Sequence, residues 1–385
     1  MKSYCKHIDI TDCDFCLFAV HEFLRGKRNR HDVSELLAIY GGEEGLASFI
    51  AANIRDRTVS VAPIQYFNRI EPISGKHRVI GRESALHQCY DYVAVFGLME
   101  LFDAKIGHYQ TASLPGKGQI FAKKAIEKWI RERQARYFVK LDIRKYYPSM
   151  SQEVLRSMLA KDVCNDALLY LTFYLLDQFP QGINIGSFLS QYLANYYASK
   201  AYHFAQERLR RERKSKRTGE VTSRRLIDHC LFYMDDILLM GHDKSDLKMA
   251  VRMLSRYMSK VLRVELKPWK VCVVDKEPID MVGYVFYSYK TTIRPGIFVR
   301  AMRAFRKAEK AERISLHLAY RCISYYGYFK HSDSRQVIEK YHIDRIVREC
   351  RDVVSLAGLE GRLNERLFPG GAEACRLAAT PRRLR

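Results

Sequence analysis

Two adjacent carboxylates, Asp235 and Asp236, stand between two apolar runs rich in β-forming residues, 230–232 and 237–240. Such runs predict a hairpin that carries the acids at its turn. Neighbouring carboxylates repel each other, and a bound cation relieves the repulsion. Paired carboxylates can hold two Mg²⁺ ions that align the attacking and leaving oxygens of a phosphodiester-forming reaction. An ordinary solvated turn also explains two adjacent aspartates, so the metal site needs support from the rest of the chain.

That support begins with a second β-like run, residues 137–143, which contains Asp142 near its end. A strand with one aspartate beside a hairpin with two would supply three carboxylates from neighbouring β elements. We therefore expect Asp142, Asp235 and Asp236 to form one metal site.

The composition indicates a folded protein with a polyanionic partner. The 385 residues are 48% hydrophobic and 28% charged, and the formal net charge is +22 with a pI near 9.5. Such a charge surplus destabilises a compact fold by self-repulsion, and nucleic acid relieves it. A membrane partner is not expected, because no basic amphipathic helix stands apart and no apolar run approaches the ~20 residues of a bilayer span. The N-terminus lacks a secretory signal pattern, so we expect a cytoplasmic protein.

The ten cysteines are then expected to be reduced thiols. Cys5, Cys13 and Cys16 lie close together in the sequence, and the last two form a CxxC pair. No second CxxC follows at zinc-ribbon spacing, so free thiols are favoured, with zinc binding as the open alternative.

Hydrophobic periodicity predicts mostly helices around these short β runs. A hairpin is expected over 73–80 and another over about 271–289, and residues 113–118 read as a loop. Residues 208–225 contain nine Lys or Arg against two Glu, which describes either a phosphate-binding insertion or a solvated arm. The helical expectation covers residues 1–60, 81–104, 119–133, 151–178, 187–213, 244–262 and about 300 onward.

Residues 141–150, LDIRKYYPSM, resemble the first palm motif of reverse transcriptases. The resemblance implies that Asp142 and the adjacent Ile143 are metal ligands and that Tyr147 is the aromatic wall beneath the incoming sugar. A ring packed against C2′ leaves no space for a 2′-hydroxyl and so favours dNTPs. A core aromatic is the alternative reading of Tyr147.

Residues 184–195, NIGSFLSQYLAN, resemble the second palm motif. The resemblance implies that Gly186 lets the backbone approach nucleotide and template closely, and that Gln191 lies near the incoming base pair. The Ser-Gln ending is typical of the bacterial branch with defence-associated and diversity-generating retroelement enzymes. Asn184 stands where the family usually has a proline, which is a departure in the shape of this turn.

Further positions match the family in the expected order. Lys270 resembles the lysine that protonates the leaving pyrophosphate, and Lys76 and Arg78 resemble the residues that clamp the triphosphate. Gly283 and Tyr284 resemble the hairpin that grips the primer. A solvated surface charge is the alternative for each basic residue.

The resemblance implies an α+β, right-hand polymerase fold. Its parts are expected to be a helical extension (1–60), fingers (61–135), a palm with an antiparallel sheet and the basic insertion (136–290), a helical thumb (291–365) and a tail (366–385). Aromatic and basic residues at helical spacing near residues 315–330 match a thumb helix along the primer duplex, with core packing as the equal alternative.

The implied activity is RNA-directed DNA polymerisation, a nucleotidyl transfer that uses two Mg²⁺ ions, with Mn²⁺ as a possible substitute. The implied partners are an RNA template, the DNA product, dNTPs and a dedicated non-coding RNA, with a protein partner or a second copy of the chain also possible. Bacterial anti-phage defence is the expected setting. The alternatives are a diversity-generating retroelement or retron-type enzyme, template-independent or protein-primed DNA synthesis, and a non-catalytic RNA-binding maturase.

Overall fold

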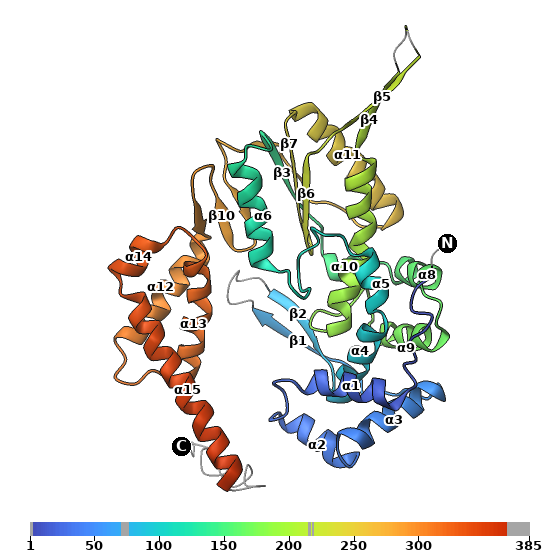
Figure 1. Ribbon diagram of the computed structural model, residues 1–385, viewed down its shortest axis with the longest axis vertical. Coiled ribbons are helices and arrows are strands. Elements are labelled where there is room, and N and C mark those ends of the chain that lie inside the picture. Colours follow the sequence, from blue (N-terminus) through green and yellow to red (C-terminus); the bar gives the residue numbers. More distant parts are fainter. Residues whose placement is uncertain (1–2, 71–76, 215–216, 218, 368–385) are drawn as a thin grey trace. The chain divides into compact units, whose positions relative to one another are not determined.

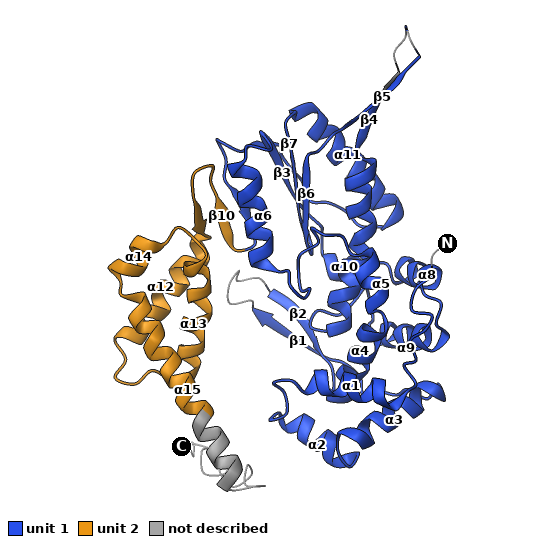
Figure 2. Cartoon of the chain, viewed as in Figure 1, with its two compact units in different colours: residues 1–282 blue, residues 283–385 orange. Residues whose placement is uncertain are grey.

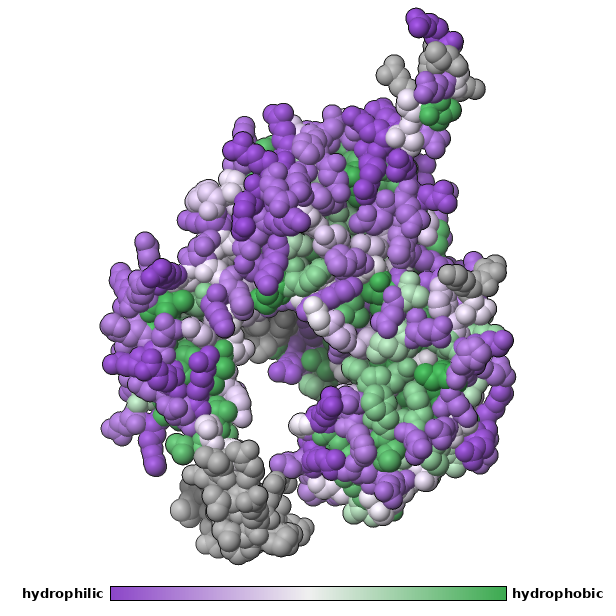
Figure 3. All heavy atoms as spheres, viewed as in Figure 1, coloured by the Kyte–Doolittle hydropathy of each residue, from purple (hydrophilic) through white to green (hydrophobic). Residues whose placement is uncertain are grey.

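The computed structural model describes residues 3–70, 77–214, 217 and 219–367. The chain divides into two compact units, residues 1–282 and 283–385 (Figure 2). Hydrophilic residues cover much of the face drawn in Figure 3. Within the described residues, no helix has a stretch that is long and apolar enough to cross a membrane.

The first unit begins with three helices, α1 (Cys13–Leu24), α2 (His31–Ile39) and α3 (Glu43–Arg55), as the periodicity predicts (Figure 1). The Asp12 side chain caps α1 by accepting a hydrogen bond from the Phe15 backbone. Helix α1 packs against α3 and against α4 (Ala85–Gly97), and its buried side chains join the main core of the unit.

A two-stranded antiparallel ribbon follows, made of β1 (Gln65–Ile70) and β2 (His77–Arg82). The hairpin was expected over 73–80 with Arg78 at its turn, but its first strand begins at Gln65 and Arg78 lies within β2, paired with Arg69. Lys76 lies outside the described residues. The helices α5 (Met99–Lys105) and α6 (Gln119–Arg131) come after α4. The sequence therefore placed these helices correctly.

The central sheet of the first unit has four antiparallel strands in the order β6-β7-β3-β8. Their bounds are β3 (Tyr137–Asp142), β6 (His229–Tyr233), β7 (Asp236–Gly241) and β8 (Cys272–Val273). Helix α6 contacts β6, and α11 (Lys244–Val261) contacts β3 and β7 (Figure 1). The remaining elements of this unit are α7 (Tyr146–Ser149), α8 (Gln152–Asp162), α9 (Asp166–Asp177), α10 (Phe188–His203) and β9 (Ile279–Met281).

The helix expected over 187–213 is shorter than predicted. Helix α10 ends at His203, a π-helical turn covers Phe204–Arg208, and the chain then forms β4 (Arg210–Lys214). This strand pairs with β5 (Val221–Arg225) in a hairpin that projects from the unit (Figure 1). Long basic side chains suit either structure, so pairing with β5, not local propensity, decides for a strand.

At the base of this hairpin, Arg224 and Arg211 form ion pairs with the buried Asp246 carboxylate of α11. Much of the segment predicted to be a basic insertion, 208–225, therefore forms a charged ribbon that is anchored at one end; that it is an insertion stays a prediction. Whether it binds phosphates stays a prediction.

The second unit contains the hairpin β10 (Tyr284–Phe286) and β11 (Thr291–Ile293), followed by four helices. These are α12 (Pro295–Glu309), α13 (Leu316–Lys330), α14 (Arg335–Lys340) and α15 (Ile343–Leu367). Tyr325 and Phe329 on α13 are buried in the core of the unit, which supports their core-packing interpretation. The first two residues of the expected tail (366–385) belong to α15, and residues 368–385 lie outside the described part of the chain.

Candidate active site

The three predicted carboxylates meet at one end of the central sheet. Strand β3 pairs with β7 so that Asp142 lies directly opposite Asp236. Asp235 stands next to them in the turn between β6 and β7, and its carbonyl accepts a 3.0 Å hydrogen bond from the Ile143 backbone. Met234 completes this turn with φ +52°, a left-handed conformation. The hairpin that the sequence predicted is therefore present, and its register decides the site.

Side chains alternate between the two faces of β3, so the Asp142 side chain lies on the face that points away from the core. Val139 and Leu141 are buried, whereas Lys140 and Asp142 share the opposite, half-exposed face. The side chains of Asp142 and Asp236 keep 28% and 24% of their surface exposed, so both remain accessible to a ligand.

Two lysines that were not predicted lie against these acids. Lys140 Nζ is 3.1 Å from Asp236 Oδ1, and Lys267 Nζ is 2.7 Å from Asp142 Oδ1. Lys140 could have been predicted, because it lies two residues before Asp142 on the same strand and therefore on the same face. Lys267 could not, because its contact depends on how a distant loop returns to β3.

The electrostatics of the cluster favour a bound cation. Burial raises the pKa of Asp235, and the neighbouring charges of Asp236 and Asp142 raise it further. Arg78 lowers the pKa of Asp235, which places its guanidinium within electrostatic range of the carboxylates. Carboxylate oxygens are the ligands that hard divalent cations prefer, so the donor set fits such a metal.

Tyr147 lies beside the carboxylate turn. Its hydroxyl is 3.8 Å from Met234 Sδ, and its carbonyl accepts a 3.1 Å hydrogen bond from the Ile183 backbone. Burial raises the pKa of the Tyr147 phenol to about 12, with a smaller contribution from Asp235. The structure thus brings this ring next to the carboxylate turn, and its role as a steric wall stays a prediction.

The glycine turn of the second motif packs against strand β2. Gly186 has φ +115°, and a Cβ there would stand 3.3 Å from the Gly81 carbonyl oxygen. The Gly81 N–H donates to the Ile185 carbonyl over 3.3 Å. Asn184, which replaces the usual proline, donates from its side chain to the Gly81 carbonyl over 3.2 Å. The departure at Asn184 therefore adds a hydrogen bond to the neighbouring strand.

Helix α10 connects this turn to the carboxylate hairpin through Asn195. Its side-chain amide donates to the carbonyls of Ala112 and Gln191, each over 3.0 Å, and lies 4.0 Å from Met234 Sδ. The Asn195 carbonyl in turn accepts from the buried Gln110 side chain over 2.7 Å. Gln191 itself is half-buried on α10. Sequence reasoning missed Asn195 and Gln110, since buried amides carry no spacing pattern.

The remaining predicted residues are not all gathered here. Lys270 forms an ion pair with Glu277 and is 76% exposed, so Lys267 is the lysine that contacts an active-site carboxylate. Gly283 and Tyr284 belong to the second unit, where the Tyr284 ring is buried 5.5 Å from that of Tyr328.

The N-terminal cysteines do not gather around a common point. Cys13 is exposed with its Sγ 3.8 Å from Ser48 Oγ, and the buried Cys16 thiol donates to the Ile10 carbonyl over 3.3 Å. Among the described residues, the group of His, Cys, Asp and Glu side chains whose ligand atoms all lie within 4.8 Å of one another contains none of Cys5, Cys13 and Cys16. It does not contain the three sheet-edge carboxylates either, so their side chains must move closer together to share an ion.

Comparison with known proteins gives a family match and a distant structural one. Residues 70–286 match the family described as "Reverse transcriptase (RNA-dependent DNA polymerase)". No curated protein matches the chain. Among solved structures, the chain is similar to an apo telomerase from Candida tropicalis truncated from its C-terminal domain, with 13% identity and a TM-score of 0.42. That match covers 60% of this chain and 54% of the telomerase chain, about half its length.

Proposed function

The chain belongs to the reverse transcriptase family, and we propose that it is an RNA-directed DNA polymerase with Asp142, Asp235 and Asp236 as its catalytic carboxylates. Family membership also confirms the expected α+β, right-hand polymerase fold and implies that the protein binds nucleic acid. The limits of fingers, palm and thumb stay predictions.

One observation carries the assignment of the site. The register of β3 and β7 sets Asp142 opposite Asp236, and the adjacent turn adds Asp235. Burial and the neighbouring acids raise the pKa of Asp235, and a cation bound among the three carboxylates would relieve this cost. Ordinary solvated turns do not bring a third acid from a separate strand.

We assign the binding of two Mg²⁺ ions, or Mn²⁺ in their place, to these carboxylates and the Ile143 carbonyl. When bound, the metal pair supplies charge stabilisation for the attacking 3′-oxygen and the leaving pyrophosphate. Tyr147 excludes the 2′-hydroxyl of a ribonucleotide, and Arg78 binds the triphosphate, where a fixed cation stabilises developing charge.

The other predicted contacts complete the proposal. Gly186 and Gln191 face the template and the new base pair, Gly283 and Tyr284 contact the primer, and Lys76 joins Arg78 at the triphosphate. Lys270 donates a proton to the pyrophosphate. Because Lys267 contacts Asp142, a comparison of Lys267→Ala with Lys270→Ala tests which of the two lysines supports the reaction.

The decisive experiment is primer extension on an RNA template by the Asp235→Asn/Asp236→Asn variant. We expect synthesis to fall by at least about a hundredfold, because charge stabilisation in the transition state is lost. Asp228→Asn is the matched control, since Asp228 lies just before β6 and pairs with His242, away from the catalytic turn. Undiminished DNA synthesis by the double variant would refute the site.

For the biological setting we propose a bacterial, cytoplasmic enzyme of anti-phage defence that copies a dedicated non-coding RNA. The Ser190-Gln191 ending of the second motif supports the bacterial branch, and the +22 charge supports a stable RNA partner. A protein partner or a second copy of the chain would complete the assembly.

Sequencing of the RNA that copurifies with the protein, together with its DNA products, tests this setting. We expect one enriched structured RNA, DNA complementary to it, and phage resistance that is lost in Asp235→Asn/Asp236→Asn. Random or simple-repeat DNA made without RNA would instead support template-independent or protein-primed synthesis. Resistance that persists in the double variant would support a non-catalytic RNA-binding role.

A further inference from the structure

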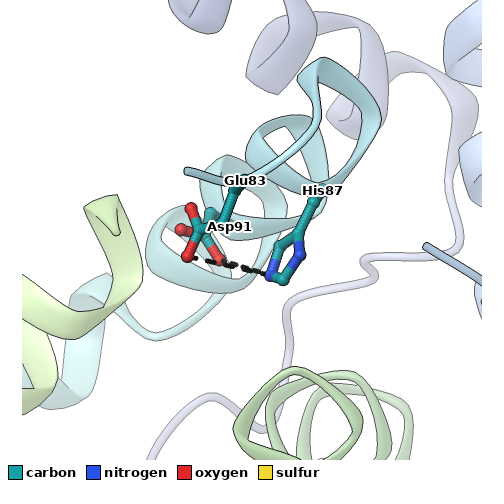
Figure 4. A group of neighbouring side chains, drawn as sticks. All are labelled: Glu83, His87 and Asp91. Carbon is teal, nitrogen blue, oxygen red and sulfur yellow. Dashed lines mark ion pairs between the residues drawn. The ribbon is translucent and has the colours of Figure 1, made fainter. Parts of the chain in front are cut away.

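A buried polar cluster lies away from the catalytic carboxylates, at the start of helix α4 (Figure 4). Its members are Glu83, His87 and Asp91, which are 4%, 0% and 0% exposed. Ser84 caps α4 by accepting a 3.2 Å hydrogen bond from the His87 backbone, and the four-residue spacing puts the three side chains on one face. Neither the family resemblance nor the polymerase site uses this cluster.

The His87 ring faces both carboxyl groups without a hydrogen bond to either. His87 Nε2 is 3.9 Å from Asp91 Oδ1 and 4.0 Å from Glu83 Oε1, which is too long for hydrogen bonds. Both His87 ring nitrogens and Asp91 Oδ1 have no hydrogen-bond partner within the described parts of the chain. Buried polar atoms without partners are rare in folded proteins, and a water or an ion is the usual explanation.

We propose that Glu83, His87 and Asp91 bind a divalent transition-metal ion, with Zn²⁺ as the reference ion. Their ligand atoms lie within 4.8 Å of one another. An ion at the centre of such a triangle lies about 2.3–2.5 Å from each atom, a few tenths of an ångström beyond ~2.0–2.2 Å zinc–ligand distances. Small side-chain shifts therefore complete the site.

The donor set selects the class of metal. One imidazole nitrogen with two carboxylates suits Zn²⁺ or Mn²⁺, whereas Mg²⁺ prefers oxygen ligands and retains its waters. Two deprotonated carboxylates match the charge of a divalent ion, and metal binding releases any proton that the buried pair holds.

Surrounding groups hold the carboxylates in ligating positions. The Ser187 hydroxyl and the Leu189 backbone donate to Asp91 Oδ2 over 2.7 and 3.2 Å, which leaves Oδ1 free. The Asn184 side chain donates to Glu83 Oε1 over 2.9 Å. Metal sites usually have such outer hydrogen bonds to their ligands.

The same groups connect the cluster to the active site. Asn184 and Ser187 flank Gly186, and Ser187 caps the helix that carries Gln191. A metal at the cluster would therefore hold the glycine turn at Gly186 against α4 and β2. Its role is structural, and it is separate from the metal pair of the reaction.

The test measures metal content in the full-length protein with Asp235→Asn/Asp236→Asn as background, so that the catalytic site contributes little. After dialysis into Mg²⁺ buffer, mass spectrometry of the eluted metals should show about one equivalent of transition metal per chain. His87→Gln and Asp91→Asn should each lose it. His31→Gln is the matched control, because His31 and Glu35 share the same helical spacing at 65% and 61% exposure, and it should retain the metal.

A second measurement covers variants that fail to fold. The chelator-stripped background protein should gain thermal stability when Zn²⁺ is added, since a ligand that binds the folded state raises Tm. The proposal is overturned if the purified protein carries no transition metal and Zn²⁺ leaves its Tm unchanged. It is also overturned if Asp91→Asn keeps as much metal as His31→Gln. Neither outcome depends on polymerase activity.

Discussion

Removing the Ser187 side chain tests most directly how the glycine turn at Gly186 is attached to the buried face of α4. Its hydroxyl oxygen caps α10 by accepting a 3.1 Å hydrogen bond from the Ser190 backbone, and its hydroxyl hydrogen donates to Asp91 Oδ2 over 2.7 Å. Both partners are buried. We predict that Ser187→Ala destabilises the first unit and reduces DNA synthesis, because the turn with Gly186 loses its anchor.

The magnitude follows from the two contacts. Loss of a helix N-cap costs about 1 kcal/mol. Loss of a buried hydrogen bond to a carboxylate costs about 1.5–3 kcal/mol, because the acceptor remains desolvated. Since one hydroxyl makes both contacts, we expect a total of about 2.5–4 kcal/mol in the free energy of unfolding.

Urea unfolding followed by tryptophan fluorescence measures this loss selectively, because Trp129 and Trp269 both lie in the first unit. Ser151→Ala is the matched control. Ser151 caps α8 by accepting a 3.3 Å hydrogen bond from the Val154 backbone, and its loss should cost only about 1 kcal/mol. If Ser187→Ala were no more destabilising than Ser151→Ala, the contact with Asp91 would carry no weight and the reasoning would fail.

Three further changes test the site and the second unit. Tyr147→Ala should raise ribonucleotide incorporation relative to dNTPs by roughly tenfold or more in primer extension, and unchanged sugar discrimination would place the steric wall elsewhere. Gly186→Ala places a side chain at φ +115° and should lower the free energy of unfolding by about 1–3 kcal/mol in the same urea assay. An unchanged free energy of unfolding would show that the backbone at Gly186 does not need this conformation. Phe329→Ala should cost about 3–5 kcal/mol and speed hydrogen exchange in α12 and α13, because the ring is 1% exposed. Tyr320→Ala, 55% exposed, is its control and should change little.

The outline of the fold follows from local patterns in the sequence. Apolar residues on either side of Asp235 and Asp236 predicted the hairpin, and helical periodicity predicted most of the helices. The prediction failed where a strand was read as the end of a helix, at residues 210–214. There the chain carries long basic side chains that suit both structures, and only pairing with a segment further along separates them.

The candidate site was predictable in part, for the same reason. Asp142 and Tyr147 could be found because their residue types and local motif persist wherever the segment folds. Lys267 at Asp142 and Asn195 beside Met234 could not, because these contacts join segments that are far apart in the sequence.

The sequence by itself determined the chemistry available to this protein. It determined three carboxylates on β elements, an aromatic ring near one of them, and a basic surface for nucleic acid. Tertiary structure decided which carboxylate faces which, which lysine contacts Asp142, and that Glu83 and Asp91 share a buried space with a His87 ring that has no hydrogen-bond partner among the described residues. Residue type and periodicity are local properties of the chain, whereas strand register and the burial of a charge depend on segments that meet only after folding.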